Sequence, residues 1–402
     1  MKAVVIGGSG RFGRATASFL AADRLVSRLI VAGRERAKAQ AYAGRLGPKA
    51  AGASVEVHDA PSLDHLLADA DIVVNASGPY LDTLSPVLEA AIRTRTHYVD
   101  FAEDARAVER ALALDAQARA SGVTALVGFG GAPGITNLLA VHAARQLDSV
   151  DRIQVGWVAD IEALLGPIQT ILDDMRGGRV NAAIQSILSY AAGSARVLRE
   201  GRWCEIAAFA EGEGEPVALT EGIEVVAYPI AAAEPLMLHR HLPAVRSIVS
   251  LMSLIPPQVN DLLRAQAAPL AGGAISAEQA AIALFEALAR NPDRWLARPK
   301  EMFKGAKFAV ARGVKDARPA RYACAPNWRC RAPDATIERP DTGAVAALAA
   351  LKVMAGDIAQ RGVLLPEACF EPLPFFAELD ARWGAPRDGP LLKERFDWLD
   401  GR

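Results

Sequence analysis

The chain has 402 residues, of which 51% are hydrophobic and 23% charged, as is usual for a globular protein rather than a disordered or fibrous one. Its 45 basic and 46 acidic side chains give a net charge of -1, so no long-range attraction favours nucleic acid or an anionic membrane as a partner. This length exceeds what one hydrophobic core usually supports, and we expect at least two domains.

The cysteines and the apolar segments predict a cytoplasmic protein. Four cysteines are too few for a disulfide scaffold, and none forms a C-x-x-C pair: Cys204, Cys324, Cys330 and Cys369. The apolar run at residues 3–8 is too brief for a signal peptide. The longest uninterrupted apolar stretch, residues 344–351, is far shorter than the roughly 20 residues of a membrane span. We therefore expect a reducing compartment and no membrane span.

The first 130 residues alternate between buried strands and helices. The pattern predicts strands at residues 2–6, 29–32, 54–59, 71–79, 98–104 and 123–131, with helices at 11–22 and 35–47 among those between them. Most of these strands are apolar throughout, which indicates burial on both faces of a parallel sheet. We predict an α/β fold of the Rossmann type, a doubly wound parallel sheet.

A glycine-rich corner follows the first predicted strand. Gly8, Gly10 and Gly13 satisfy G-x-G-x-x-G, in which the glycines permit a tight turn, a close approach of the backbone to a pyrophosphate, and close packing of helix on strand. The N-terminus of the next helix adds unpaired N–H groups and positive partial charge. We predict that a dinucleotide binds here, and the other residues expected to contact it are Ser9, Arg11 and Phe12.

The second strand predicts which dinucleotide binds. Gly33 stands about 20 residues after the motif, where an acid would read the ribose hydroxyls of NAD. Without that acid there is room for a 2'-phosphate, which Arg34 can hold by a charge-assisted contact, with Arg36 as a second donor. We predict NADP (NADPH) rather than NAD. In the alternative, both arginines are solvated residues of the next helix.

Five segments taken together resemble the saccharopine dehydrogenase-like family of oxidoreductases: residues 4–13 (VVIGGSGRFG), 31–34 (VAGR), 73–80 (VVNASGPY), 97–104 (HYVDFAED) and 131–140 (GAPGITNLLA). A weaker likeness continues at 234–243 and 361–379, so it spans most of the chain. The resemblance implies an NADP-binding first domain, a small-molecule substrate, and a second domain that commonly makes a homodimer contact. Ala132 stands where some amine-forming relatives carry an acid, which speaks against a saccharopine-type substrate.

After residue 130 the alternation stops. Strands are predicted at 149–160, 202–210, 223–230, 245–252, 307–314 and 320–326, with helices around 171–197 and at 276–290. Runs of strands with few helices between them predict a second α+β domain with a mainly antiparallel sheet. We place the Rossmann domain at 1–130 and the substrate and dimerisation domain at 131–341. The resemblance implies that residues 342–402, which begin with a helix at 342–361, pack back on the first domain.

The chemistry is expected at the loops after strands four to six, because ligands of doubly wound sheets lie outside the carboxyl ends of the strands. There we expect Asn75, Ala76 and Gly78 to contact the cofactor. Tyr80 and Asp100 are the candidate catalytic residues, as proton donor and as charge partner. In the alternatives, Tyr80 is a packed aromatic and Asp100 caps the helix at 103–114.

No metal site is predicted. His239 and His241 would share one face of an extended strand, but no acid or thiol stands at a matching spacing. The prediction is an NADP-dependent oxidoreductase that transfers a hydride between NADPH and a small C=N or C=O substrate. Two alternatives remain: a trans-acting enoyl reductase on a thioester-bound chain, and a non-catalytic NADP-sensing or scaffold protein.

Overall fold

The computed structural model describes residues 1–162, 168–176, 182–296, 305–337 and 340–400. The chain divides into two compact units. The first unit comprises Met1–His142 and Asn327–Leu392, and the second comprises Ala143–Pro326 and Lys393–Arg402.

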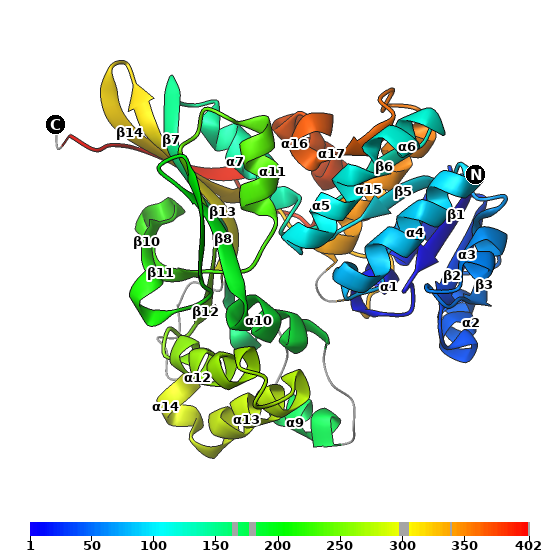
Figure 1. Ribbon diagram of the computed structural model, residues 1–402, viewed down its shortest axis with the longest axis horizontal. Helices are drawn as coiled ribbons and strands as arrows, with labels where there is room; N and C mark the ends of the chain where they lie inside the picture. Colours follow the sequence, from blue (N-terminus) through cyan, green and yellow to red (C-terminus); the bar gives the residue numbers. More distant parts are fainter. Residues whose placement is uncertain (163–167, 177–181, 297–304, 338–339, 401–402) are drawn as a thin grey trace. The chain divides into compact units, whose positions relative to one another are not determined.

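The first unit is built on a parallel sheet, as the sequence predicted. In the described residues the sheet has seven strands, in the spatial order β15 (Gly362–Leu364), β6 (Thr124–Leu126), β5 (His97–Asp100), β4 (Ile72–Asn75), β1 (Lys2–Ile6), β2 (Arg28–Gly33) and β3 (Ala50–Ser54). Figure 1 labels β6, β5, β1, β2 and β3 among them. Every strand pair in it is parallel. Val4 and Val5, which point to opposite faces of β1, are both fully buried. Burial on both faces is the reason that the strand sequences show no alternation.

Helices follow the strands of this sheet: α1 (Arg11–Ala22), α2 (Arg36–Arg45), α3 (Ala60–Leu67), α4 (Tyr80–Thr94), α5 (Ala105–Ala113), α6 (Asp115–Ala120), α7 (Ile135–Ala144), α15 (Asp341–Ala355), α16 (Pro366–Cys369) and α17 (Pro372–Trp383). The bounds of α1 agree with the predicted helix at 11–22, and it buries Ala15, Phe19 and Leu20. The helix predicted at 342–361 ends earlier, because Gly356 caps α15 in a left-handed conformation.

The third strand differs from the prediction. The alternating residues 54–59 predicted a strand, whereas β3 is Ala50–Ser54 and pairs with β2. Small side chains are required there, because a Cβ atom on Gly52 would lie 2.3 Å from the backbone nitrogen of Gln40 in α2. The position of β3 is therefore decided by close packing of α2 on the strand, which hydrophobic alternation in the sequence does not indicate.

The second unit contains a mixed sheet that is mainly antiparallel, as predicted. Its described part has nine strands: β10 (Glu215–Ala218), β11 (Glu224–Pro229), β12 (Ser247–Ile255), β7 (Ser149–Asp160), β13 (Gly305–Lys315), β14 (Arg318–Pro326) and β16 (Leu392–Trp398) follow one path, and β8 (Ser194–Arg199) and β9 (Arg202–Ala207) attach through β12. The pair β12 and β7 is parallel. The pairs of β13 with β7 and β14, of β11 with β10 and β12, and of β8 with β9 and β12 are antiparallel.

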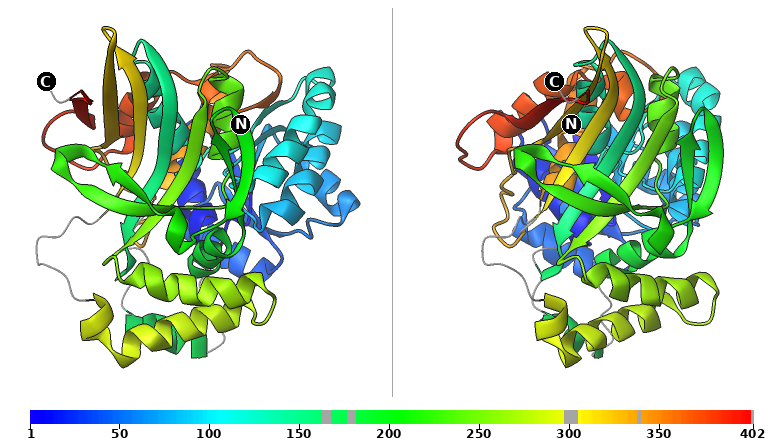
Figure 2. Two further views of the ribbon diagram at one scale, coloured as in Figure 1. Left: turned by 60° about the vertical axis from the view of Figure 1, so that its left-hand side comes forward. Right: turned by 90° about the vertical axis from the view of Figure 1, so that its left-hand side faces the viewer.

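Two apolar cores lie on this sheet. Met252 and Leu254 of β12 pack with the helices α9 (Ile168–Arg176), α10 (Ala182–Ala192), α12 (Val259–Ala271) and α13 (Ala277–Arg290), which Figure 2 shows gathered together. The other core joins Val249 and Leu251 of β12 to Val217 of β10 and Val310 of β13. In the sheet, β11, β12 and β7 lie between β10 and β13. Residues of β10 and β13 nevertheless share this core, so the sheet curls over it.

The boundaries of the two units differ from the predicted domain boundaries after residue 130 and after residue 341. The first unit continues to His142 and takes up the chain again at Asn327, where Asn327 donates hydrogen bonds to the carbonyls of Asp388 and Pro390. The last strand, β16, belongs to the second sheet rather than to the first unit. It carries Asp397, which pairs with Arg321 of β14 at 2.6 Å.

None of the four cysteines, all of which are among the described residues, forms a disulfide. Of the helices in the described residues, none is long and apolar enough to cross a membrane. His239 and His241 do not lie on an extended strand, because α11 (Glu234–His241) is a helix with Pro235 in its first turn. Proline is favoured at that position, since the N–H that it lacks would be unpaired there.

Candidate functional site

The glycine-rich turn joins β1 to α1. Gly7 has φ +74°, and a Cβ atom on it would lie 2.5 Å from the carbonyl oxygen of Ala76. The residue that makes the tight turn is therefore Gly7 and not Gly8, which corrects the role assigned to Gly8 within the motif. Two adjacent glycines after β1 were the available signal, but only the backbone shows which of them is left-handed. Gly7 also brings the turn against the loop that follows β4.

Gly13 and Gly10 adapt α1 to this turn. A Cβ atom on Gly13 would lie 2.2 Å from the carbonyl oxygen of Gly7, so the close contact of α1 is with the turn, whereas the sequence predicted it with the strand. Gly10 is the N-cap of α1 and offers no side chain to its N–H groups, and the first turn of α1 has no acidic residue. The backbone N–H groups of Arg11, Phe12 and Gly13 have no acceptor within the helix. With Gly10, Arg11 and Phe12 exposed, this helix end fits an anion such as a diphosphate.

The tip of β2 lies next to this turn. The Cβ position of Gly33 is 3.9 Å from the hydroxyl oxygen of Ser9, so the glycine turn and the end of β2 are neighbours. Arg34 and Arg36 are exposed, and no hydrogen bond or ion pair of either guanidinium occurs among the described residues. Both cations are thus available to an anionic group, and Arg34 is the nearer to the turn along the chain.

Asn75 holds the loop after β4 from within. Its side chain is fully buried, and its Oδ1 accepts hydrogen bonds from the backbone N–H of Ser77 at 3.1 Å and from the Ser77 hydroxyl at 2.6 Å. Its Nδ2 donates to the hydroxyl of Tyr98 at 3.3 Å. These contacts satisfy a buried amide that would otherwise be costly and fix the backbone of Ala76 and Ser77. The sequence did not indicate Tyr98, which is on the neighbouring strand β5.

Asp100 is at the end of β5 and is fully buried. Its Oδ1 accepts hydrogen bonds from the backbone N–H groups of Ala102 at 2.9 Å and Gly128 at 2.8 Å, and its Oδ2 accepts one from the Tyr98 hydroxyl at 2.7 Å. Burial raises the pKa of Asp100 to about 6, although these three hydrogen bonds favour the charged form. The carboxylate thus connects the loops after β5 and β6.

The helix α5 has a different cap from the one considered in the sequence. Asp104, not Asp100, is its N-cap and accepts hydrogen bonds from the N–H groups of Arg106 and Ala107. These bonds and the Arg106 guanidinium lower the pKa of Asp104 in spite of its partial burial. The capping alternative for Asp100 is therefore wrong, since its acceptor positions face the loops instead.

Three aromatic rings meet where the strands end. Tyr80, the first residue of α4, donates a hydrogen bond of 2.9 Å to the carbonyl oxygen of Asn75. Its ring meets Phe101 edge-on at a centroid distance of 5.9 Å, and Phe101 meets Phe12 in the same way at 5.8 Å. Phe101 and Tyr80 are buried, whereas Phe12 is 36% exposed. Phe101 was missed in the sequence, although its position directly after Asp100 at a strand end was a signal.

The loop after β6 is tied to a distant segment. Asn137 accepts a hydrogen bond from the backbone N–H of Gly134 at 3.1 Å, and its Nδ2 donates to the carboxylate of Glu367 at 3.2 Å. Glu367 is in α16, directly after β15, so it stands at the carboxyl end of the strand beside β6. No sequence pattern links the two residues, which are 230 positions apart.

The fold and the turn define the first unit as a dinucleotide-binding domain of the Rossmann type. Residues 3–126 match the family model of the saccharopine dehydrogenase NADP binding domain. The predicted resemblance to the saccharopine dehydrogenase-like family is therefore confirmed, and so is the predicted NADP-binding class of the first domain.

The chain is also similar to individual saccharopine dehydrogenases, both in sequence and in fold. The chain is 35% identical over 152 residues to the NADP(+)-dependent, L-glutamate-forming saccharopine dehydrogenase of Saccharomyces cerevisiae, which covers 38% of this chain and 31% of that protein. It thus spans about a third of the length of this curated relative. The solved apo saccharopine dehydrogenase (L-Glu forming) of the same yeast matches 98% of this chain and 99% of its own, with a TM-score of 0.66 and 18% identity. That structure shows a common fold along nearly the whole chain.

Proposed function

We propose that the protein is an NADP(H)-dependent oxidoreductase that transfers a hydride between NADPH and a small substrate with a C=N or C=O bond. The observation that carries this proposal is the uncapped, exposed N-terminus of α1 at the glycine turn, with Arg34 exposed at the tip of the neighbouring strand β2. The name of the yeast relative, an NADP(+)-dependent dehydrogenase, supports the cofactor and the class of reaction.

The diphosphate of the cofactor would bind at the turn, where the contacts are assigned to Gly8, Ser9, Gly10, Arg11, Phe12 and Gly13. Arg34 would hold the 2'-phosphate, because a guanidinium pairs with phosphate through two parallel hydrogen bonds. Ala76 and Gly78 would contact the nicotinamide half, since Gly7 packs against the Ala76 carbonyl and so brings this loop to the turn. Asn75, whose amide is engaged inside the domain, would act by holding that loop in place.

Hydride transfer requires a fixed geometry at the cofactor ring and a proton or charge partner at the substrate heteroatom. We assign the second task to Tyr80 and Asp100, which share one network through Asn75 and Tyr98. The rings of Phe12 and Phe101 supply an apolar wall in the same unit, and such a wall excludes water from the reacting atoms. When bound, NADPH supplies the hydride.

We also propose a cellular location and an oligomeric state for the protein. Four cysteines that form no disulfide fit a cytoplasmic protein. We propose that the second unit makes a homodimer, and light scattering of the purified full chain tests this by its mass. A monomer at micromolar concentration would contradict it.

The experiment that tests the function is a screen of NADPH oxidation by the purified protein. Pairs of an amine with a keto acid or an aldehyde are the main substrates, and enoyl thioesters are tested beside them. Turnover of an amine and carbonyl pair, or of a carbonyl alone, is the expected result. Turnover of enoyl thioesters alone would assign the protein to the enoyl reductases. Tight NADPH binding without any turnover would contradict an enzymatic role.

A further inference from the structure

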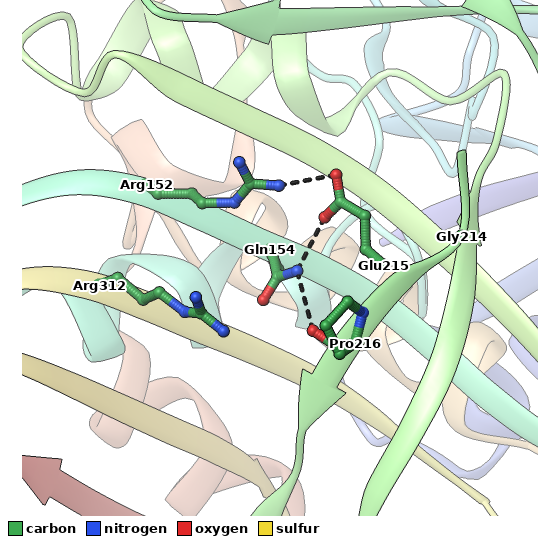
Figure 3. Close-up of a pocket in the computed structure, with 6 residues that line it drawn as sticks. All are labelled: Arg152, Gln154, Gly214, Glu215, Pro216 and Arg312. Carbon is green, nitrogen blue, oxygen red and sulfur yellow. Dashed lines mark hydrogen bonds and ion pairs between the residues drawn. The ribbon is translucent and has the colours of Figure 1, made fainter. Parts of the chain in front are cut away.

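A hollow of about 190 Å³ lies on the curled sheet of the second unit. Its lining consists of Arg152, Gln154, Gly214, Glu215, Pro216 and Arg312. Figure 3 shows Arg152 and Gln154 on β7, Arg312 on β13, and the segment of Glu215 and Pro216 facing them. The hollow is next to the core between β10 and β13, so charged groups are held here against an apolar interior.

Three arginines form a row across adjacent strands. In the sheet register Arg312 of β13 stands directly opposite Arg152 of β7 on one side and opposite Arg321 of β14 on the other. Like charges directly opposite one another in a sheet are destabilising. Such a row is stabilised by anions, and carboxylates of the described residues form ion pairs with only two of the three arginines.

The two outer arginines have carboxylate partners. Arg152 forms an ion pair of 2.7 Å with Oε1 of Glu215, and Arg321 forms one of 2.6 Å with Asp397. The second oxygen of Glu215 accepts a hydrogen bond of 2.8 Å from Nε2 of Gln154, so both of its oxygens are in use. Both oxygens of Glu215 are thus directed to Arg152 and Gln154, and among the described residues Glu215 forms no ion pair with Arg312.

The central arginine lacks such a partner. Among the described residues no carboxylate forms an ion pair with Arg312, and its buried Nε has no hydrogen-bond acceptor. Burial, followed by the charges of Arg321 and Arg152, lowers the pKa of Arg312. A half-buried cation between two like charges costs free energy, and an anion placed against it would remove that cost.

We propose that this hollow binds a small oxyanion, the phosphate or carboxylate group of a metabolite, with Arg312 as its principal ligand and Arg152 as the second. A volume of about 190 Å³ admits a group of this size and is far too small for a dinucleotide. The site lies within the second unit, so it goes beyond the proposed function and does not depend on it.

The test uses the full chain in saturating NADP(+), so that the glycine turn of the first unit does not contribute phosphate binding. Inorganic phosphate and acetate are titrated in separate arms at constant ionic strength kept with chloride, and binding is measured by calorimetry and by the shift of the thermal midpoint. Saturable binding in the phosphate arm assigns a phosphate-bearing ligand, and saturable binding in the acetate arm assigns a carboxylate. Binding in neither arm overturns the proposal.

Variants locate the binding. Arg312→Gln is expected to weaken it at least about tenfold, because a charge-assisted contact is lost. Arg290→Gln, which changes an exposed arginine at the end of α13, is the matched control and leaves the affinity unchanged. Glu215→Gln keeps an acceptor for Gln154 but frees Arg152, so it tightens binding several-fold. Equal affinities of the Arg312→Gln and Arg290→Gln proteins overturn the proposal. If Arg312→Gln does not fold, Glu215→Gln decides, since an unchanged affinity there also overturns it.

Discussion

The hydroxyl of Tyr98 donates a hydrogen bond of 2.7 Å to Oδ2 of Asp100, and both side chains are fully buried. The same hydroxyl accepts from Asn75, so one phenol joins the loop after β4 to the loop after β5. Because Asp100 also accepts from Gly128, the loop after β6 belongs to the same network. Three loops of the proposed site therefore depend on two buried side chains of β5.

Tyr98→Phe is expected to lower the free energy of unfolding by about 2 kcal/mol, because a hydrogen bond to a buried carboxyl group is removed and not replaced. Urea unfolding at neutral pH measures this. Tyr228→Phe is the control, since the ring of Tyr228 packs on Arg264 and no hydrogen bond of its hydroxyl occurs among the described residues. A loss no larger for Tyr98→Phe than for Tyr228→Phe would show that the network contributes little.

The stability of the protein should depend on the ionisation of Asp100. Its pKa is raised from 3.8 to about 6 by burial, so the folded state binds this proton more tightly than the unfolded state does. The contribution of Asp100 to the free energy of unfolding is therefore largest below about pH 4. It falls by about 3 kcal/mol as the pH rises to about 6, and it is constant at higher pH.

Asp100→Asn tests this pH dependence, because an amide does not titrate. The difference in unfolding free energy between the variant and the parent should shift in favour of the variant as the pH rises from about 4 to about 6. Urea unfolding at several pH values measures that difference. If it is independent of pH, Asp100 is already ionised throughout this range.

Arg34→Ala is expected to weaken NADPH binding by about 10- to 100-fold, because a charge-assisted contact with the 2'-phosphate is lost. NADH lacks that phosphate, so its affinity should not change. Fluorescence titration with both cofactors measures the two effects. Arg24→Ala changes an exposed arginine in the turn between α1 and β2 and serves as the control. Equal weakening of both cofactors would refute selective recognition of the phosphate.

Two glycine substitutions should have opposite effects. A Cβ atom on Gly13 would lie 2.2 Å from the carbonyl oxygen of Gly7, so Gly13→Ala must displace α1 or the turn and should lower both the stability and the NADPH affinity. Gly44 is inside α2 with nothing within 4 Å of its Cβ position, so Gly44→Ala should stabilise the protein by about 0.5 to 1 kcal/mol. Thermal unfolding and NADPH titration compare them. Normal NADPH affinity in Gly13→Ala would contradict the role of the turn.

Tyr80→Phe tests the assignment of the proton donor. Once the screen identifies a substrate, kcat should fall about 100-fold while the dissociation constant for NADPH stays unchanged, as is usual when a general acid is removed. Thr83→Ser, a change one turn along α4, is the control. Full activity of Tyr80→Phe would show that Tyr80 is not the proton donor and that it acts structurally, for example by packing against Phe101 and by its bond to the Asn75 carbonyl.

Local sequence patterns were sufficient to predict those elements whose structure is decided by residues close together along the chain. The bounds of α1, the glycine motif and the start of β4 depend on turn chemistry and on burial of both sheet faces, and sequence patterns indicate both. The end of β4 was not predicted, since the strand expected at 71–79 ends at Asn75. The third strand was misplaced because its small residues are required by the approach of α2 to Gly52, which is a contact between elements.

The amino-acid sequence by itself determined the class of the first domain, since this follows from glycine spacing and hydrophobic period over short stretches. It also predicted the cofactor type, from the missing acid at Gly33 with Arg34 beside it. Only the tertiary structure decided which side chains meet. Asn137 reaches Glu367 because β15 lies beside β6, and Arg312 stands between Arg152 and Arg321 because the strand register aligns them. The physical reason is that burial and charge pairing depend on distances through space, and residues far apart in the chain acquire those distances only when the sheets form.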